Sequence, residues 1–161
     1  MGAVSIVACD VDLNRIHAFS ATEGRVCYNS PTWPLEVLQR HDVVLVEVAS
    51  PVQTGGSGAK GAAQAYNRRK WAIGNSFEVG RLAALAEPLG FLSRILVSPA
   101  NLWTGSHPES VREAIAGCAG QDNHDIRACR CMIHFYNLTP KHWVPLTQYY
   151  PNLSKKGNKT K

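Results

Sequence analysis

Four carboxylate side chains fall where separate structural elements are expected to begin or end. Asp10 closes the first apolar run of the chain, and Glu47 interrupts a second, strongly apolar run. Asp122 and Asp125 stand three residues apart, just ahead of a further apolar segment. Oxygen ligands of this kind suit Mg²⁺ or Mn²⁺. Two such ions about 4 Å apart can activate water and stabilise the leaving oxygen of a phosphodiester. The four acids therefore predict divalent-metal chemistry on phosphate.

Each acid also has a structural explanation when it is considered alone. Asp122 suits the N-cap of a helix, where a carboxylate accepts backbone N–H bonds. Asp10 can begin a turn with Asp12 and Asn14. Glu47 is harder to explain, because a lone charge in a buried strand is costly unless it is paired or binds a metal. Taken together, the four acids are better explained by one metal site than by four separate structural roles. Like charges about 4 Å apart repel by roughly 4 kcal/mol at an effective dielectric of 20, so such a cluster either raises the pKa of some members or holds cations.

The elements that position these acids follow from the apolar pattern. The short apolar runs predict strands at 4–10, 15–20, 25–29, 42–48 and 93–98. The helical spacing and cap signals predict helices at 34–40, 62–87, 108–118 and 122–136. The first three strands follow one another too closely for parallel neighbours, which predicts an antiparallel meander. The fourth strand follows a helix and can therefore lie parallel to the first. The expected fold class is α/β, with a mixed five-stranded sheet flanked by helices.

Length and composition limit the class of protein. The chain has 161 residues, of which 45% are apolar, so one domain with a sizeable core is expected. We place that domain at 1–138 and an extended basic tail at 139–161. No apolar run approaches the roughly 20 residues of a membrane helix, and no secretory signal is recognisable. Five cysteines, an odd number, fall mostly in apolar segments and are expected to be reduced. These features predict a cytoplasmic protein.

The positive charge is uneven along the chain. The formal net charge is +5, and the basic residues concentrate near the start of the long helix, at Lys60, Arg68, Arg69 and Lys70, and in the tail, at Lys155, Lys156, Lys159 and Lys161. Clustered positive charge predicts a polyanionic partner such as nucleic acid. The alternative is a solvated helix face followed by a solvated tail. Tyr66 lies in the same region and is a candidate for stacking on unpaired bases.

Two other motifs indicate different chemistry. Residues 56–61 match G-x-G-x-x-G, but several loop residues separate them from the preceding strand, so a dinucleotide site is not expected. We predict a loop at 50–61, which is either a plain linker or a segment in which Lys60 and backbone amides meet a phosphate; the plain linker is the favoured alternative. A zinc site is the other alternative, suggested by His124, Cys129, Cys131 and His134. Cysteines two apart on a helix face nearly opposite ways, which favours core packing.

The arrangement of acids and elements over residues 4–136 resembles the RuvC-type Holliday junction resolvases, members of the RNase H-like nuclease fold. The resemblance depends on a first-strand Asp in Ile6-Val7-Ala8-Cys9-Asp10 and a fourth-strand Glu in Val44-Leu45-Val46-Glu47. It also includes the small-residue helix around residues 73–85 and the terminal Asp122-x-x-Asp125.

The resemblance implies a function and a set of site residues. It implies a Mg²⁺-dependent homodimer, with two ions in each site, that resolves four-way DNA junctions by paired symmetrical nicks. Asp10, Glu47, Asp122 and Asp125 are implied to be the metal ligands, and His124 can assist. Two alternatives stay open: an RNase H-like nuclease that acts on flaps or RNA–DNA hybrids, and a protein that binds branched DNA without cutting it.

Overall fold

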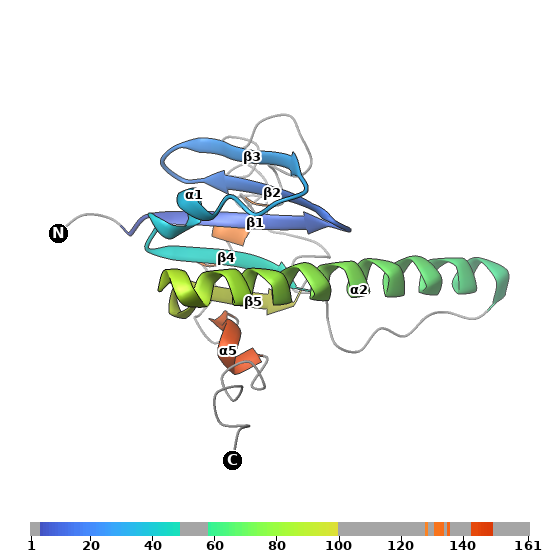
Figure 1. Cartoon of the computed structure of the whole chain (residues 1–161). Coiled ribbons are helices and arrows are strands. Elements are labelled where there is room, and N and C mark those ends of the chain that lie inside the picture. The colour runs from blue at the N-terminus through green and yellow to red at the C-terminus, as the bar shows by residue number, and fades with distance from the viewer. Residues whose placement is uncertain are drawn as a thin grey trace, which may run out of the picture.

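A mixed six-stranded sheet is the centre of the molecule (Figure 1). The computed structural model describes residues 4–48, 58–99, 128, 131–133, 135 and 143–149. The strands lie in the order β3-β2-β1-β4-β5-β6. They are β1 (Ile6–Asp12), β2 (Arg15–Ser20), β3 (Gly24–Ser30), β4 (Val43–Val48), β5 (Ile95–Pro99) and β6 (Val144–Pro145). The described helices are α1 (Leu35–Gln39), α2 (Gly58–Leu89), the 3-10 turn η1 (Leu92–Arg94) and α5 (Leu146–Tyr149).

The pairing of the strands confirms the predicted mixed α/β sheet. β1, β2 and β3 form an antiparallel meander, because each connection is a tight turn. β4 is reached through α1 and lies parallel to β1, and β5 is reached through α2 and lies parallel to β4. The predicted parallel pairing of the first strand with the fourth strand is therefore confirmed.

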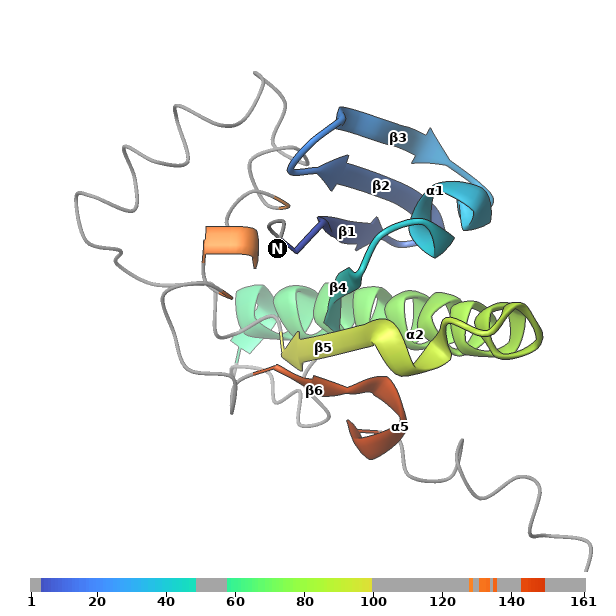
Figure 2. The ribbon, with the colours of Figure 1, turned by 90° about the vertical axis from the view of Figure 1, so that its left-hand side faces the viewer.

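Two details of the predicted architecture are wrong. The sheet has a sixth strand, because residues 143–149, expected in an extended tail, form β6 and α5 beside β5 (Figure 2). A two-residue strand that contains a proline carries almost no strand signal, which is why the sequence pattern missed it. The long helix also begins at Gly58, inside the stretch expected to be a loop. The helix predicted at 108–118 lies outside the described residues, as does most of the one at 122–136, of which residues 128, 131–133 and 135 are helical.

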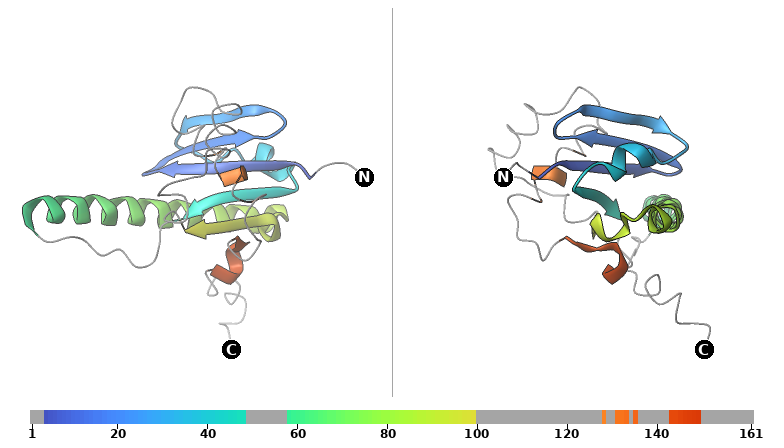
Figure 3. Two further views of the ribbon diagram at one scale, coloured as in Figure 1. Left: turned by 180° about the vertical axis from the view of Figure 1, so that it is seen from behind. Right: turned by 60° about the vertical axis from the view of Figure 1, so that its left-hand side comes forward.

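The two faces of the sheet carry two separate cores. Alternate side chains of a strand point to opposite faces. Val7, Cys9 and Val46 belong to the core that α1 and α2 cover. Ile6 and Leu45 belong to the second core, together with Ala128, Cys131, Met132 and Trp143. Figure 3 shows α2 and the helical residues around 131–133 on opposite sides of the sheet. The strands β1 and β4 are thus buried on both faces, as their continuous apolar sequences predict.

α2 is far longer than the sheet that it covers. Its 32 residues span about 48 Å, whereas the seven residues of β1 span about 23 Å. Among the side chains of α2 that the structure describes, the buried positions begin at Asn75 and include Val79 and Leu82. The N-terminal half of α2 therefore projects beyond the sheet, as Figure 1 shows. Among the described helices, none combines the length and the apolar character needed to cross a membrane.

α2 makes its closest backbone approach to the sheet at the turn between β1 and β2. Leu13 in that turn adopts a left-handed conformation, with φ of 60°. A Cβ atom at Gly74 would lie 3.2 Å from the Leu13 carbonyl oxygen, so the absence of a side chain permits this contact. The contact holds the middle of α2 against the end of β1 at which Asp10 lies.

The opposite end of the sheet is held by Asp42. Its carboxylate accepts hydrogen bonds from the Ser5 backbone N–H and hydroxyl, both at 3.1 Å. The Asp42 backbone N–H donates in turn to the Ser5 hydroxyl oxygen at 2.9 Å. These bonds join the starts of β1 and β4 and help to set their parallel register. The hydrogen bonds from Ser5 hold the pKa of the Asp42 carboxyl below its ordinary value.

We expect the Asp42→Asn variant to lose the part of the folding stability that comes from the charged Asp42 carboxylate. Because the folded-state pKa is lowered, the charged carboxylate stabilises the fold at neutral pH, and that contribution disappears as the pH falls below about 3.9, the ordinary pKa of aspartate. The variant should therefore unfold at a lower temperature than the wild type at pH 7. The difference should shrink as the pH is lowered from 5 towards 2. Thermal unfolding followed by circular dichroism across this range measures it, and a constant difference would contradict the assignment.

Candidate metal site

Asp10 and Glu47 lie side by side on neighbouring parallel strands. The register of β1 and β4 pairs Cys9 with Val46, and the two acids are the next residue on each strand. Neighbouring strands are about 4.8 Å apart. Both acids lie towards the carboxyl ends of their strands, which is the edge where α/β sheets form their sites. The structure thus brings together the two predicted acids that fall within the described residues.

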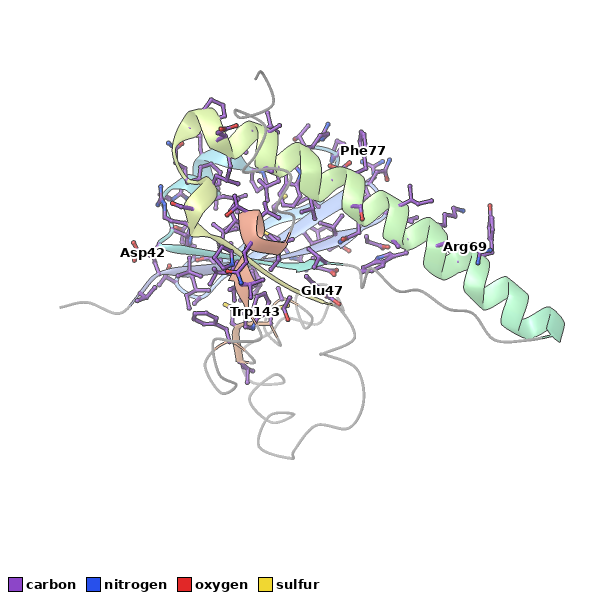
Figure 4. The ribbon with its side chains drawn as sticks, turned by 90° about the horizontal axis from the view of Figure 1, so that it is seen from below. Asp42, Glu47, Arg69, Phe77 and Trp143 are labelled. Atoms are coloured by element: carbon purple, nitrogen blue, oxygen red, sulfur yellow. The ribbon has the colours of Figure 1, made fainter. Side chains whose placement is uncertain are left out.

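Both acids point to the sheet face opposite α2. Asp10 is two residues after Ala8, and Glu47 is two residues after Leu45. Ala8 and Leu45 both belong to the core that lies on that face. Strand alternation therefore places both carboxylates there. Figure 4 shows Glu47 and Trp143 on this side of the sheet, with α2 on the other.

Burial makes this pair of acids unusual. Asp10 is 1% exposed and Glu47 is 9% exposed. Taking carboxylates out of water costs several kcal/mol for each ion unless partners compensate. A divalent cation is a partner that compensates two carboxylates at once, and carboxylate oxygens are the ligands that Mg²⁺ and Mn²⁺ prefer. The donor set therefore fits such an ion.

Two further polar residues flank Asp10 and Glu47 on the neighbouring strands, so that four polar residues form a row across the sheet. His17 on β2 pairs with Asp10, and Ser98 on β5 pairs with Glu47. Both are buried, and the Ser98 hydroxyl has no hydrogen-bond partner among the described residues. The sequence analysis did not identify either residue. The available signal was a polar residue within an apolar strand, as in Ile16-His17-Ala18, but it has meaning only once the strand register is known.

Asn75 supports the site from the α2 side. Its side-chain amide donates to the Glu47 carbonyl oxygen at 3.0 Å, and the whole side chain is buried. This bond joins α2 to Glu47, the penultimate residue of β4. It therefore restrains the main chain that carries the Glu47 carboxylate. A third buried acid, Glu78, lies on α2 and forms an ion pair with Arg81 at 3.2 Å on the α2 side of the sheet, so it does not belong with Asp10 and Glu47.

The remaining predicted metal ligands fall outside the described residues. These are Asp122 and Asp125, together with the assisting residue His124. Ala128, which follows Asp125 by three residues, packs in the same core as Ala8 and Leu45. Within the described part of the chain, no group of three or more His, Cys, Asp or Glu residues could hold a metal ion.

The cysteines of the described residues do not contribute reactive groups. Cys9 and Cys27 are free cysteines. Burial raises the pKa of the Cys9 thiol far above its ordinary range, and burial also raises that of Cys27. Both therefore stay neutral near pH 7, which disfavours nucleophilic attack and metal binding. Cys131 packs in the second core, which confirms its predicted role as a small apolar residue.

The predicted basic cluster falls on the projecting half of α2. Lys60, Arg68, Arg69 and Lys70 all belong to this helix. Arg69 and Lys70 are exposed, whereas the side chains of Lys60 and Arg68 are outside the described residues. The Lys70 ammonium lies 5.8 Å from the centre of the Tyr66 ring, which is itself exposed. Figure 4 shows Arg69 on the part of α2 that extends past the sheet. The lysines of the tail, at 155, 156, 159 and 161, are outside the described residues.

Comparison with known proteins adds no family to these observations. No family model matches the chain, and neither the curated proteins nor the solved structures include a significant match.

We expect the Asn75→Ala variant to be destabilised by about 1–3 kcal/mol, because a buried carbonyl loses its side-chain donor. The free energy of unfolding, measured with urea, tests this. The matched control is Ser76→Ala, which changes the next residue at an exposed position of the same helix and should stay within about 0.5 kcal/mol of the wild type. Equal effects of the two substitutions would show that the bond to Glu47 contributes nothing.

Proposed function

We propose that this protein is a metal-dependent endonuclease of the RuvC-like class that cuts four-way DNA junctions by paired nicks. The observation that carries the proposal is the pair of buried carboxylates, Asp10 and Glu47, adjacent on parallel strands and on one face of the sheet. The sheet also has the mixture of antiparallel and parallel strands that the sequence pattern predicts.

Asp122 and Asp125 complete the proposed site. In the sequence, Asp125 precedes Ala128 by three residues, and Ala128 is helical and packs on the face to which Asp10 and Glu47 point. Residues three apart on a helix share a side. A helix that extended back from Ala128 would therefore carry both aspartates towards the same face, with His124 between them in the sequence.

The proposed roles of the residues follow from this arrangement. One or two bound Mg²⁺ or Mn²⁺ ions would activate a water and neutralise charge on the phosphate that is cut. Asp10 and Glu47 would hold the cations from the sheet, and Asp122 and Asp125 would complete the ligand set. Asn75 keeps the main chain at Glu47 in place. The basic residues of α2 bind backbone phosphates away from the cut.

A homodimer is part of the proposal, because a two-fold symmetric substrate is cut symmetrically by a two-fold symmetric enzyme. α2 carries two large apolar side chains in solvent, Ile73 at 71% and Phe77 at 64% exposure. They are four residues apart and therefore share one side of the helix. This side of α2 would suit contact with a second copy of the chain.

The Asp10→Asn variant tests the catalytic role. It removes one negative charge without changing the size of the side chain, and we expect cleavage of a four-way junction with Mg²⁺ to fall by more than about 100-fold, since losing even an outer-shell partner of a metal costs 10–100-fold. Binding of the junction in Ca²⁺ should remain within a few-fold of the wild type. Cleavage assays and gel-shift titrations measure the two effects.

The choice of substrate separates this function from its alternatives. The wild type should be incubated with a four-way junction, a flap, an RNA–DNA hybrid and linear duplex, in Mg²⁺ and in Mn²⁺. Paired symmetrical nicks in the junction alone support the proposal. Cleavage of the flap or the hybrid alone favours the RNase H-like alternative, and binding without cleavage favours a DNA-binding protein. Full cleavage by Asp10→Asn would exclude the metal site described above.

The double variant Arg69→Ala/Lys70→Ala tests the DNA contact. If each side chain neutralises one phosphate, the slope of log K against log salt concentration should become shallower by about 2, because each contact contributes about 0.9. The affinity for junction DNA should fall, while the cleavage rate at saturating DNA should change little. Fluorescence anisotropy at several salt concentrations measures the slope.

The matched control for charge is Arg40→Ala. Arg40 is exposed and pairs with Glu23 at 2.7 Å, just ahead of β4 and thus at the end of the sheet away from the candidate site. This variant should keep the salt slope of the wild type. An equal change of slope for each positive charge removed, two in the double variant and one in Arg40→Ala, would show a general effect of net charge and exclude a specific contact by α2.

A further inference from the structure

His17 is a buried histidine placed opposite the key aspartate of the candidate site. It pairs with Asp10 in the antiparallel register of β1 and β2, and it is 3% exposed. Residues directly opposite in such a pair have Cβ atoms about 4.5–5.5 Å apart and point to the same face. The imidazole and the Asp10 carboxylate therefore share one small, buried volume.

A bulge in β3 sits opposite His17. Ile16 pairs with Ser30 and Ala18 pairs with Cys27. Two residues of β3, Tyr28 and Asn29, therefore face the single residue His17. Asn29 has a left-handed backbone with φ of 52°, a conformation that asparagine tolerates better than most residues. Bulges of this kind often redirect a group next to a functional site.

The bulge fixes the orientation and the tautomer of His17. The Asn29 backbone N–H donates to His17 Nδ1 at 3.1 Å. A backbone N–H can only donate, so Nδ1 must be the acceptor and the ring hydrogen lies on Nε2. The Tyr28 ring meets the imidazole edge-on, with centres 5.1 Å apart, and the Arg25 guanidinium lies over the Tyr28 ring at 4.3 Å. The imidazole is thus held from the β3 side, and its ring donor is Nε2–H.

We propose that His17 is a positioning residue for the metal site, whose Nε2–H donates to the Asp10 carboxylate and holds it in the orientation that binds a divalent cation. This inference rests on the proposed metal site and adds a residue to it. A neutral donor suits the role, because it orders the carboxylate without bringing a positive charge that would oppose the cation. Partners of this kind contribute 10–100-fold in metal affinity.

Two variants of nearly equal shape isolate the donor. His17→Gln carries an amide N–H close to the position of the imidazole Nε2, whereas His17→Met has similar length and no donor. We expect His17→Met to bind Mn²⁺ 10–100-fold more weakly than the wild type and His17→Gln to recover most of that loss. The probe is Mn²⁺ alone, titrated into each full-length protein and followed by electron paramagnetic resonance of the free ion. The Mn²⁺ concentration for half-maximal junction cleavage should shift in the same order.

The control is the other buried histidine of the described chain, His41. Its Nδ1–H donates to the Val37 carbonyl oxygen at 2.7 Å, and its Nε2 lies 2.8 Å from the Ser20 hydroxyl, at the far end of the sheet. His41→Gln should lower the melting temperature and leave Mn²⁺ affinity unchanged, which separates a loss of stability from a loss of metal binding.

The outcomes distinguish this inference from the proposed nuclease. Equal Mn²⁺ affinity of His17→Met and the wild type would overturn the role of His17 while the nuclease proposal stands. Equal losses in the Met and Gln variants would also overturn it, because they would show a packing effect. A wild type that binds Mn²⁺ but cuts no DNA would refute the nuclease, and the binding data would still decide the role of His17. A wild type that binds no Mn²⁺ would overturn both.

Discussion

The parallel pairing of β1 and β4 is the constraint on which the candidate site depends. It places Asp10 beside Glu47, about one strand spacing apart and almost completely out of water. Two like charges about 4 Å apart repel by roughly 4 kcal/mol at an effective dielectric of 20, which is a large part of the net stability of a small domain. A fold keeps such a pair only when other interactions compensate it. In the proposed function a divalent cation would provide that compensation.

The described elements support this pair from the face of the sheet that α2 covers. α2 covers one face and fastens the β1–β2 turn through Gly74 and the end of β4 through Asn75. The carboxylates point to the other face, towards the core that contains Ala128 and Cys131. Structural support and chemistry are thus separated by the thickness of the sheet. The same helix projects beyond the sheet and carries Arg69 and Lys70 into solvent, so one element both supports the candidate site and presents exposed positive charge.

Much of the fold could be predicted because its signals are local. The continuous apolar runs of β1 and β4, the short turns of the meander and the small-residue helix each follow from neighbouring residues. β6 could not be predicted, since Val144 and Pro145 have no strand signal of their own and join the sheet only because β5 offers an open edge. The start of α2 was placed too late for a related reason: glycines weaken the helical signal, yet Gly58 and Gly61 lie in the helix.

Asp10 and Glu47 could be singled out as candidate ligands from the sequence, because a charge at the end of an apolar strand is costly wherever the strand lies. Their being neighbours was an inference, which the register of β1 and β4 now supports for these two residues. His17 and Ser98 were beyond the reach of the sequence. A polar residue in a strand joins a site only through its partner across the sheet, and a register shift of one residue would turn it to the opposite face. The sequence by itself determined which residues are costly to bury and which segments form strands and helices. The tertiary structure alone decided which of those residues meet, because strand pairing sets distances between positions that are far apart along the chain.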